Sequence, residues 1–558
     1  MTRSDVRHTR RAREDIPIDA ADKVTEKATG EAGEEGSAVS SPAGDDAAQG
    51  ADARTADGSA EVDDRGPKTA DDAPDATART ADGSALFAEG AAEDGAGRGE
   101  RGRRAAVDPR RMSTRAVAAV IVLLTAVMLV VAYAGKERCV GPTFDDRGRT
   151  TPDYDIRIDR DLCYSDIQYL WLDRDIDKHV FPYIHGGITP PPDSKLTGGT
   201  VEYPVLTGLL MWAGAFFAHN DGEFLLYSAL LMAPFGLLTG WMLGRLARWR
   251  ALVWALGPPL YLYAFHNWDL PVVACAVAAV YVMHGWRTSR SLRRRGVLAA
   301  VLLGVGFAFK LYPGAFVAPL MLYVLTASRP GRRDWWGAIQ VALAATATAV
   351  LINLPFALAG YDGWRASFTF QELRKVDLTT NSIWFWGFRP ESEPTNEAFQ
   401  HWVNWLSPTL VIASFVLALA IGLWRWHRSG SYPWIAVSAA MLCGFLLLHK
   451  VHSPQYTLWL VPFFVLLAVP WRWVLAYMVA DICMDVGVFR WFYAMKIKGV
   501  EVGGNVSSGL AGQLVALGVW GRAALLAVLF VVVLVGRDRL AERGTPSARS
   551  VSEAVPST

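Results

Sequence analysis

Four polar motifs interrupt the hydrophobic part of the chain, and their side chains have the chemistry to bind an anion or a sugar and to move a proton. Charged groups are costly near lipid, so charges that recur at the ends of hydrophobic runs usually serve a function. Several of them at one face of a membrane predict an enzyme or a transporter. The motifs are Tyr164-Ser165-Asp166, His266-Asn267-Trp268-Asp269, Lys310-Leu311-Tyr312-Pro313 and the run from His449 to Tyr456.

Asp166 is the candidate for proton transfer. It lies in a segment where polar and apolar residues alternate at roughly helical spacing, which predicts a short amphipathic helix at the membrane surface. A carboxylate there can accept a proton from a sugar hydroxyl. A solvated loop acid or a helix-capping acid would explain it equally well, because the same loop also holds Asp159, Asp161, Asp173, Asp175 and Asp177.

Two further motifs contain candidates for substrate binding. Glu202 and Tyr203 precede Pro204, which suits the first turn of a helix. The alternative for Glu202 is a favourable charge at that helix N-terminus. Asn267 and Asp269 lie in a turn between two hydrophobic runs, where they either bind substrate or cap the next helix.

Lys310 interrupts a continuous apolar run and is followed by Tyr312. A lysine is a compact phosphate ligand, although its long side chain can also simply reach the membrane interface. A second polar cluster surrounds a Ser-Pro break between two hydrophobic runs. It contains no carboxylate, so it favours anion or sugar recognition over a zinc site. Its members are His449, Lys450, His452, Gln455 and Tyr456.

Two other groups of charges have alternative explanations. Arg374 and Lys375 precede an aromatic stretch in a large loop, a mixture suited to phosphates and sugar rings. Asp481 and Asp485 are one helical turn apart inside a hydrophobic run. They would either carry protons in a transporter or pair with Arg490 or with a cation on another helix, and we favour the pairing.

The hydrophobic runs predict how these motifs are positioned. A membrane-spanning helix needs about 20 mostly apolar residues, and the chain has about twelve such runs. The positive-inside rule places both termini and the short Arg-rich loops in the cytoplasm. The predicted spans are residues 114–134, 223–244, 251–265, 269–286, 296–309, 312–327, 335–359, 408–426, 433–448, 454–470, 472–489 and 514–536.

The apolar segment Pro204–Ala218 decides between alternative topologies. Counting it as a span would put the basic cluster Arg245–Arg250 outside and invert every later span, so we predict that it does not cross. The large loops Gly135–Gly222 and Gly360–Ser407, and a shorter one at 491–513, are then extracytoplasmic. This arrangement gathers the polar motifs at the outer face of the membrane.

Composition divides the chain into three parts. Residues 1–111 and 538–558 have few large apolar side chains, so we predict disordered cytoplasmic tails around a transmembrane domain at 112–537. The first apolar run begins only after Met112, so a cleavable signal peptide is not expected. The net charge is +1, and topology explains the short Arg clusters better than binding to nucleic acid does.

The five cysteines predict one disulfide. Cys139 and Cys163 share an extracytoplasmic loop, where oxidation is permitted, and we expect them to be bonded. Cys275, Cys443 and Cys483 lie in apolar runs and are interpreted as packing residues. Their spacing indicates no metal site.

Five motifs, in their order and spacing from about Thr114 to Arg537, resemble a known family. Glycosyltransferase family 87 belongs to the GT-C superfamily and comprises polyprenyl-phosphate-mannose-dependent α-mannosyltransferases of bacterial envelopes. The long tail and the cysteine pair are not part of the family pattern. The motifs are Tyr164-Ser165-Asp166, Glu202-Tyr203-Pro204-Val205-Leu206, Asn267-Trp268-Asp269-Leu270, Lys310-Leu311-Tyr312-Pro313 and the run from Ser453 to Leu460.

The resemblance implies an all-α, GT-C-like bundle of transmembrane helices in the plasma membrane, with the active site on the outer face. It implies that Asp166 is the base of an inverting transfer of a sugar, with mannose expected, from a polyprenyl-phosphate donor to an envelope lipid or glycan, without a cofactor. The phosphate would leave as an anion stabilised by Lys310, Lys450 or Arg374.

Two other classes of protein remain open. A secondary transporter or flippase of an envelope precursor would use Asp481 and Asp485 and is expected to contain an internal repeat, which the sequence does not show. A non-catalytic scaffold would not require polar residues at Lys310 or from His449 to Tyr456. The sequence therefore favours an enzyme.

Overall fold

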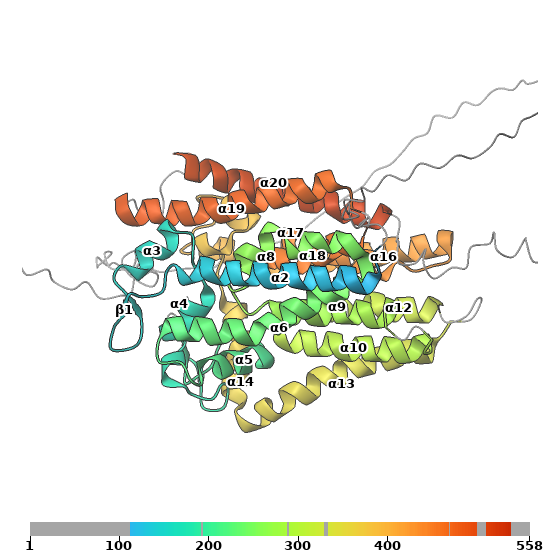
Figure 1. Cartoon of the computed structure of the whole chain (residues 1–558), viewed down its shortest axis with the longest axis horizontal. Helices are drawn as coiled ribbons and strands as arrows, with labels where there is room; N and C mark the ends of the chain where they lie inside the picture. The colour runs from blue at the N-terminus through green and yellow to red at the C-terminus, as the bar shows by residue number, and fades with distance from the viewer. Residues whose placement is uncertain are drawn as a thin grey trace, which may run out of the picture. The chain divides into compact units, whose positions relative to one another are not determined.

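The computed structural model describes residues 112–190, 194–286, 289–327, 333–467, 469–498 and 509–536. These residues form a bundle of α-helices with two short β-hairpins (Figure 1). The prediction of an all-α membrane protein is confirmed. The predicted tails at 1–111 and 538–558, and most of the predicted loop at 491–513, lie outside the described residues.

The longer helices make up the body of the bundle. They are α2 (Thr114–Glu137), α6 (Asp221–Ala247), α9 (Leu270–His284), α10 (Leu292–Phe309), α12 (Val317–Ala327), α13 (Trp335–Ala359), α16 (Glu397–Ser429), α17 (Trp434–Leu448), α18 (Thr457–Leu466), α19 (Trp471–Lys498) and α20 (Leu510–Val535).

Shorter elements connect these helices or cover their ends. They are β1 (Thr143–Phe144), β2 (Thr150–Thr151), α3 (Tyr154–Arg160), α4 (Asp166–Asp173), β3 (Gly187–Ile188), β4 (Leu196–Thr197), α5 (Val205–Ala215), α7 (Leu252–Ala255), α8 (Pro258–Tyr263), α11 (Tyr312–Ala315), α14 (Tyr361–Leu373) and α15 (Ile383–Trp386), with 3₁₀ turns η1 (Ile176–Lys178), η2 (Arg248–Ala251), η3 (Leu378–Thr380) and η4 (Pro454–Tyr456).

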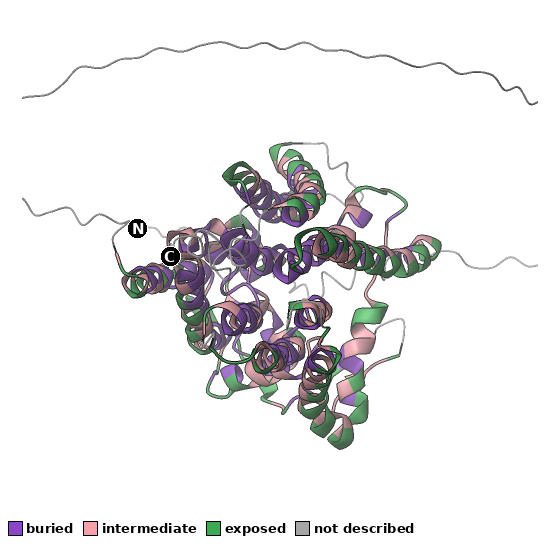
Figure 2. Ribbon diagram, turned by 90° about the vertical axis from the view of Figure 1, so that its right-hand side faces the viewer, coloured by how far each residue is buried: buried purple, intermediate pink, exposed green. Residues whose placement is uncertain are grey.

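The outer faces of the long helices are apolar and exposed, as lipid contact requires (Figure 2). Leu123 on α2 is 64% exposed, Leu351 and Leu358 on α13 are 69% and 78% exposed, and Val535 on α20 is 76% exposed. A water-soluble domain rarely exposes so much apolar surface. The chain is therefore a multi-pass membrane protein.

Each of the twelve predicted spans is at least partly helical. Five stretches are long and apolar enough to cross a membrane unaided: α2, Asp221–Ala255, α13, α16 and α20. The span predicted at 251–265 is not a single helix. Helix α7 ends at Ala255 and α8 begins at Pro258, because Gly257 and the Pro258-Pro259 pair interrupt the helical hydrogen bonds. The total of twelve spans stays a prediction.

The segment Pro204–Ala218 contains helix α5, which has 11 residues. At about 1.5 Å per residue such a helix is roughly half as long as the hydrocarbon core is thick. Thr207 on α5 donates a hydrogen bond to the carbonyl oxygen of Phe309, at the end of α10, over 2.7 Å. The length of α5 and this anchor support the prediction that the segment does not cross.

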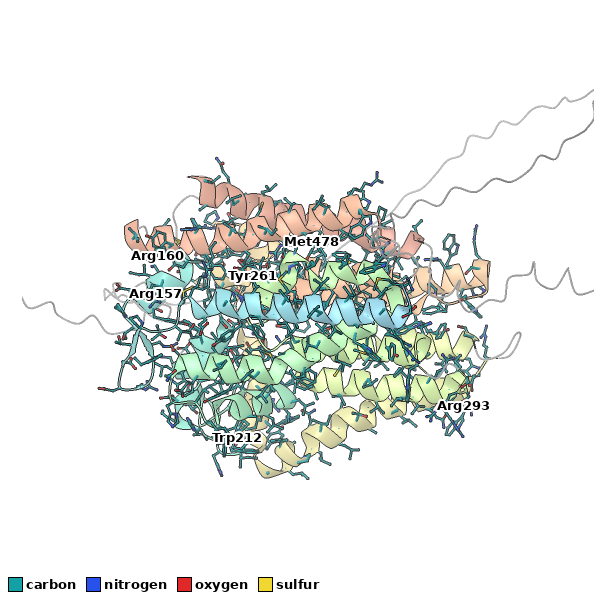
Figure 3. All side chains as sticks on the ribbon, viewed as in Figure 1. Arg157, Arg160, Trp212, Tyr261, Arg293 and Met478 are labelled. Atoms are coloured by element: carbon teal, nitrogen blue, oxygen red, sulfur yellow. A yellow bond between two sulfur atoms is a disulfide. The ribbon has the colours of Figure 1, made fainter. Side chains whose placement is uncertain are left out.

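The non-helical protein gathers at one end of the bundle. Elements β1, α3, α4, α5 and α14 all lie there (Figure 1). Arg157 and Arg160 mark this end, whereas Arg293 lies at the other end (Figure 3). The two large loops predicted from the sequence are therefore neighbours in space, and they cover the end where the polar motifs lie.

Candidate active site

Helix α4 begins at Asp166, and its start is fixed to the turn that precedes α9. The hydroxyl of Ser165 donates to the carbonyl oxygen of Phe265 over 2.6 Å, and the backbone N–H of Asp166 donates to the carbonyl oxygen of His266 over 2.8 Å. These two bonds join segments about one hundred residues apart in the sequence. They hold Asp166 beside Asn267.

The predicted disulfide is present immediately before this helix. Cys139 and Cys163 are bonded, and their Cα atoms are 6.1 Å apart, within the range that a disulfide spans. The bond connects the end of α2 to the residues that lead into α4. It therefore braces the loop that carries Asp166, whereas the other three cysteines are free, as predicted.

The bridge is expected to contribute about 2–4 kcal/mol to the free energy of unfolding, because it closes a loop with a sequence separation of 24. Adding a reductant should therefore lower the melting temperature of the wild type in detergent. A variant lacking Cys275, Cys443 and Cys483 should respond in the same way, and Cys139→Ser/Cys163→Ser should not respond. An unchanged melting temperature, with both thiols shown to be reduced, would contradict this prediction.

Asp166 is held by two uncharged donors. The Tyr164 hydroxyl donates to Asp166 Oδ1 over 2.8 Å, and the Asn267 amide donates to Oδ2 over 2.6 Å. Burial, with the added charge of Asp166, raises the pKa of Tyr164 well above its usual value, so this hydroxyl keeps its proton. Asp166 is partly exposed and has no ion pair among the described residues. A carboxylate has about four lone-pair sites, so room remains for a substrate hydroxyl.

Asn267 is the centre of the network. Lys310 Nζ donates to Asn267 Oδ1 over 2.8 Å, which fixes the oxygen of this amide toward the lysine. The Asn267 amide nitrogen therefore faces Asp166 and also donates to the hydroxyl of Tyr203 over 2.7 Å. One amide thus connects the predicted base to residues of two other motifs.

Lys310 is neutralised by Asp269. Their Nζ and Oδ1 atoms are 3.0 Å apart, and neither side chain is more than 8% exposed. The Trp459 indole N–H donates to the same Oδ1 atom over 2.7 Å. Asp269 occupies the N-cap position of α9 but makes no capping hydrogen bond through its side chain. The alternative capping role suggested by its position is therefore not observed.

Aromatic rings connect the remaining predicted residues to this network. Tyr312 and Tyr456 both stack on Trp459, with ring centroids 4.3 Å and 4.0 Å away. Tyr203 packs edge-on against Trp268 at 5.8 Å. Through Tyr456, the turn after α17 is therefore joined to the Asp269–Lys310 pair.

The other members of that turn face the second large loop. Lys450 Nζ donates to the carbonyl oxygens of Glu372 and Arg374 and to Asn404 Oδ1, over 3.3, 2.6 and 2.7 Å. Burial lowers the pKa of Lys450 to about 8 and that of His449 to about 4. Lys450 therefore fastens the second loop to the turn, rather than presenting unused donors.

Several residues predicted to bind substrate have local structural partners. Glu202 forms an ion pair with Arg174 over 2.8 Å, and Lys375 forms one with Glu397 over 2.5 Å. Arg374 ends α14, and its carbonyl oxygen is the one that Lys450 contacts. His452 and Gln455 are buried next to the network. Their part in binding substrate stays a prediction.

The pairing predicted for the intramembrane acids is present for Asp481. Its partner is Arg522 on α20, with Nη1 and Oδ1 3.6 Å apart, and not Arg490. Arg522 is a charged residue that the sequence reasoning missed. The available signal was a lone arginine inside an otherwise apolar run, where charge is costly. No group of three possible metal ligands occurs among the described residues.

The sequence matches the model of one protein family, described as Glycosyltransferase family 87, over residues 202–454. The matched residues include Tyr203, Asn267, Asp269 and Lys310, whereas Asp166 and Arg522 lie outside the match. None of the curated proteins compared with the chain matches it.

Two solved structures are similar to the chain. ArnT from Cupriavidus metallidurans, bound to undecaprenyl phosphate, has 15% identity over 78% of this chain and 81% of its own, with a TM-score of 0.35. The oligosaccharyltransferase AglB from Archaeoglobus fulgidus, in complex with an inhibitory peptide and a dolichol-phosphate, has 13% identity over 77% of this chain and 59% of its own, with a TM-score of 0.33.

The family match spans the stretch that begins before α5 and ends in the turn after α17. It thus contains the Asn267–Lys310–Asp269 core of the network, on a multi-pass helical fold. On this evidence the segment belongs to glycosyltransferase family 87, and the chain is a membrane glycosyltransferase.

Proposed function

We propose that this protein transfers a hexose, with mannose expected, from a polyprenyl-phosphate donor to a hydroxyl of an envelope lipid or glycan. Asp166 acts as the general base on the extracytoplasmic side of the plasma membrane. The observation that carries the proposal is the position of Asp166, partly exposed and held by two neutral donors at the end of the bundle where the large loops gather.

The reaction needs one base and a stabilised leaving group. The acceptor oxygen attacks the anomeric carbon while its proton passes to Asp166. The bond from that carbon to the phosphate oxygen breaks, and its electron pair leaves with the phosphate. A single displacement inverts the anomeric configuration. The phosphate is a weakly basic leaving group, so positive charge can assist its departure without a proton donor.

The neighbouring carboxylates are less suited to this role. Asp269 is 0% exposed and paired with Lys310, and Glu202 is paired with Arg174. A carboxylate paired with a cation is a weaker base, because protonation would break the pair. Asp166 combines access to substrate with two donors that orient its oxygens.

Labelled polyprenyl-phosphate-mannose and envelope lipids, added to the purified protein in lipid, test this proposal. A labelled, glycosylated lipid or glycan with inverted anomeric configuration is expected, and GDP-mannose should give none. The same assay with polyprenyl-phosphate-arabinose tests the sugar separately. Product formed only from a nucleotide sugar would overturn the proposed donor class. Uptake of intact donor into proteoliposomes without product would favour the transporter alternative.

A further inference from the structure

A second polar cluster is buried where four segments meet. Arg522 Nη2 donates to the carbonyl oxygen of Asn381 over 3.3 Å, and the next residue back, Thr380, accepts from the backbone N–H of His452 over 2.7 Å. The Thr457 hydroxyl donates to Asp481 Oδ1 over 2.6 Å. The second loop, the turn after α17 and helices α19 and α20 therefore converge on Arg522, which is 1% exposed.

This cluster contains buried polar atoms without hydrogen-bond partners among the described residues. They include Nε and Nη1 of Arg522, Nε2 of His452 and Oε1 of Gln455. Leaving such groups unsatisfied costs about 1–3 kcal/mol each, and more for charged groups. Several of them in one place indicate that the cluster holds something else when the protein works.

Arg522 differs from the other cations near the site. Lys310 is paired with Asp269 and bonded to Asn267, and Lys450 has three oxygen acceptors. Asp481 approaches Arg522 only to 3.6 Å, and the closer Oδ1 atom already accepts from Thr457. Arg522 therefore keeps guanidinium donors available for a ligand. Arginine suits a phosphate because its planar fork can donate two parallel hydrogen bonds.

The cluster adjoins the base. Tyr164, which bonds Asp166, stacks on Phe489 of α19 with ring centroids 5.3 Å apart and on His266 at 5.4 Å. His266 in turn contacts Tyr263 at 5.9 Å. Lys136 donates to the carbonyl oxygen of Tyr164 over 2.7 Å and is close enough to interact with the charges of both Asp166 and Asp485, one turn beyond Asp481.

We propose that Arg522, with His452 beside it, binds the phosphate of the lipid donor. This inference rests on the proposed function and assigns its anion site to α20 rather than to Lys310, Lys450 or Arg374. The donor's sugar would then lie between this cluster and Asp166. When the bond to the anomeric carbon breaks, the guanidinium stabilises the charge gained by the phosphate.

The test measures binding of polyprenyl phosphate without a sugar, using the rise in melting temperature of the full chain in nanodiscs. Wild-type protein should be stabilised by polyprenyl phosphate and not by the uncharged polyprenol. Arg522→Gln should bind the phosphate lipid about 10–100-fold more weakly, because it loses charge-assisted hydrogen bonds. Arg425→Gln is the matched control, since Arg425 contacts the other end of α20 through the carbonyl oxygens of Leu534 and Gly536.

A structural role for Arg522 predicts a different result. If the residue only fastens α20 to Asp481 on α19, Arg522→Gln/Asp481→Asn should restore both stability and binding. Our proposal expects this double variant to regain stability but not affinity, which keeps the test decisive where the single variant folds poorly. Binding within about twofold of wild type in a folded Arg522 variant would overturn the inference and leave the proposed function standing. Wild-type protein that ignores polyprenyl phosphate would overturn the donor class itself.

Discussion

Asp166→Asn is expected to lower turnover by about 10²–10⁴-fold, the usual contribution of a general base, while the protein still folds and binds donor. The substituted amide cannot accept a proton at neutral pH. Its oxygen can still accept from the Asn267 amide, and its nitrogen can donate to the Tyr164 hydroxyl, so both neighbouring hydrogen bonds survive. The loss should therefore appear in kcat with little change in melting temperature.

The matched control is Asp155→Asn, which changes an exposed acid in the same loop. The contact of Asp155 with Lys496 uses its backbone carbonyl oxygen and is preserved in this variant. We expect its turnover to stay within about twofold of wild type, as for most surface substitutions. If Asp166→Asn kept near-normal turnover, the base would have to be sought first at Asp269 or Glu202. The family assignment would be unaffected.

The sequence was sufficient to predict the parts of the fold that depend on local pattern. Hydrophobic runs of membrane length gave the helices, and a shared extracytoplasmic loop gave the cysteine pair. The break between α7 and α8 was missed, although Gly257 and two prolines marked it, because averaged hydrophobicity ignores what ends a helix.

The contacts within the site depend on distant segments and could not be predicted in this way. Asn267 was recognised as polar, but its bonds to Asp166 and Lys310 join residues 101 and 43 positions apart. Arg522 lies in a run apolar enough to be interpreted as an ordinary span. Its partners Asn381 and Asp481 come from a loop and from another helix, so only the folded structure brings them together.

Lys310 shows how such contacts change an expectation. The sequence suggested a lysine free to bind phosphate. The structure instead places its ammonium group against Asp269 and Asn267, with the Trp459 indole on the same carboxylate. An ammonium group that is already satisfied gains less from a phosphate, because binding would first break these bonds. We therefore expect Lys310 to act mainly by holding the network together.

Lys310→Met should lower the free energy of unfolding by about 3–5 kcal/mol, because it leaves the buried carboxylate of Asp269 without its cation. It should also lower turnover, since Asn267 loses the bond that orients its amide toward Asp166. Melting temperatures in nanodiscs and kcat measure the two effects. Adding Asp269→Asn should restore much of the stability, because no charge is then left unpaired. A Lys310→Met variant of normal stability with weakened affinity for polyprenyl phosphate would instead make Lys310 a direct phosphate ligand.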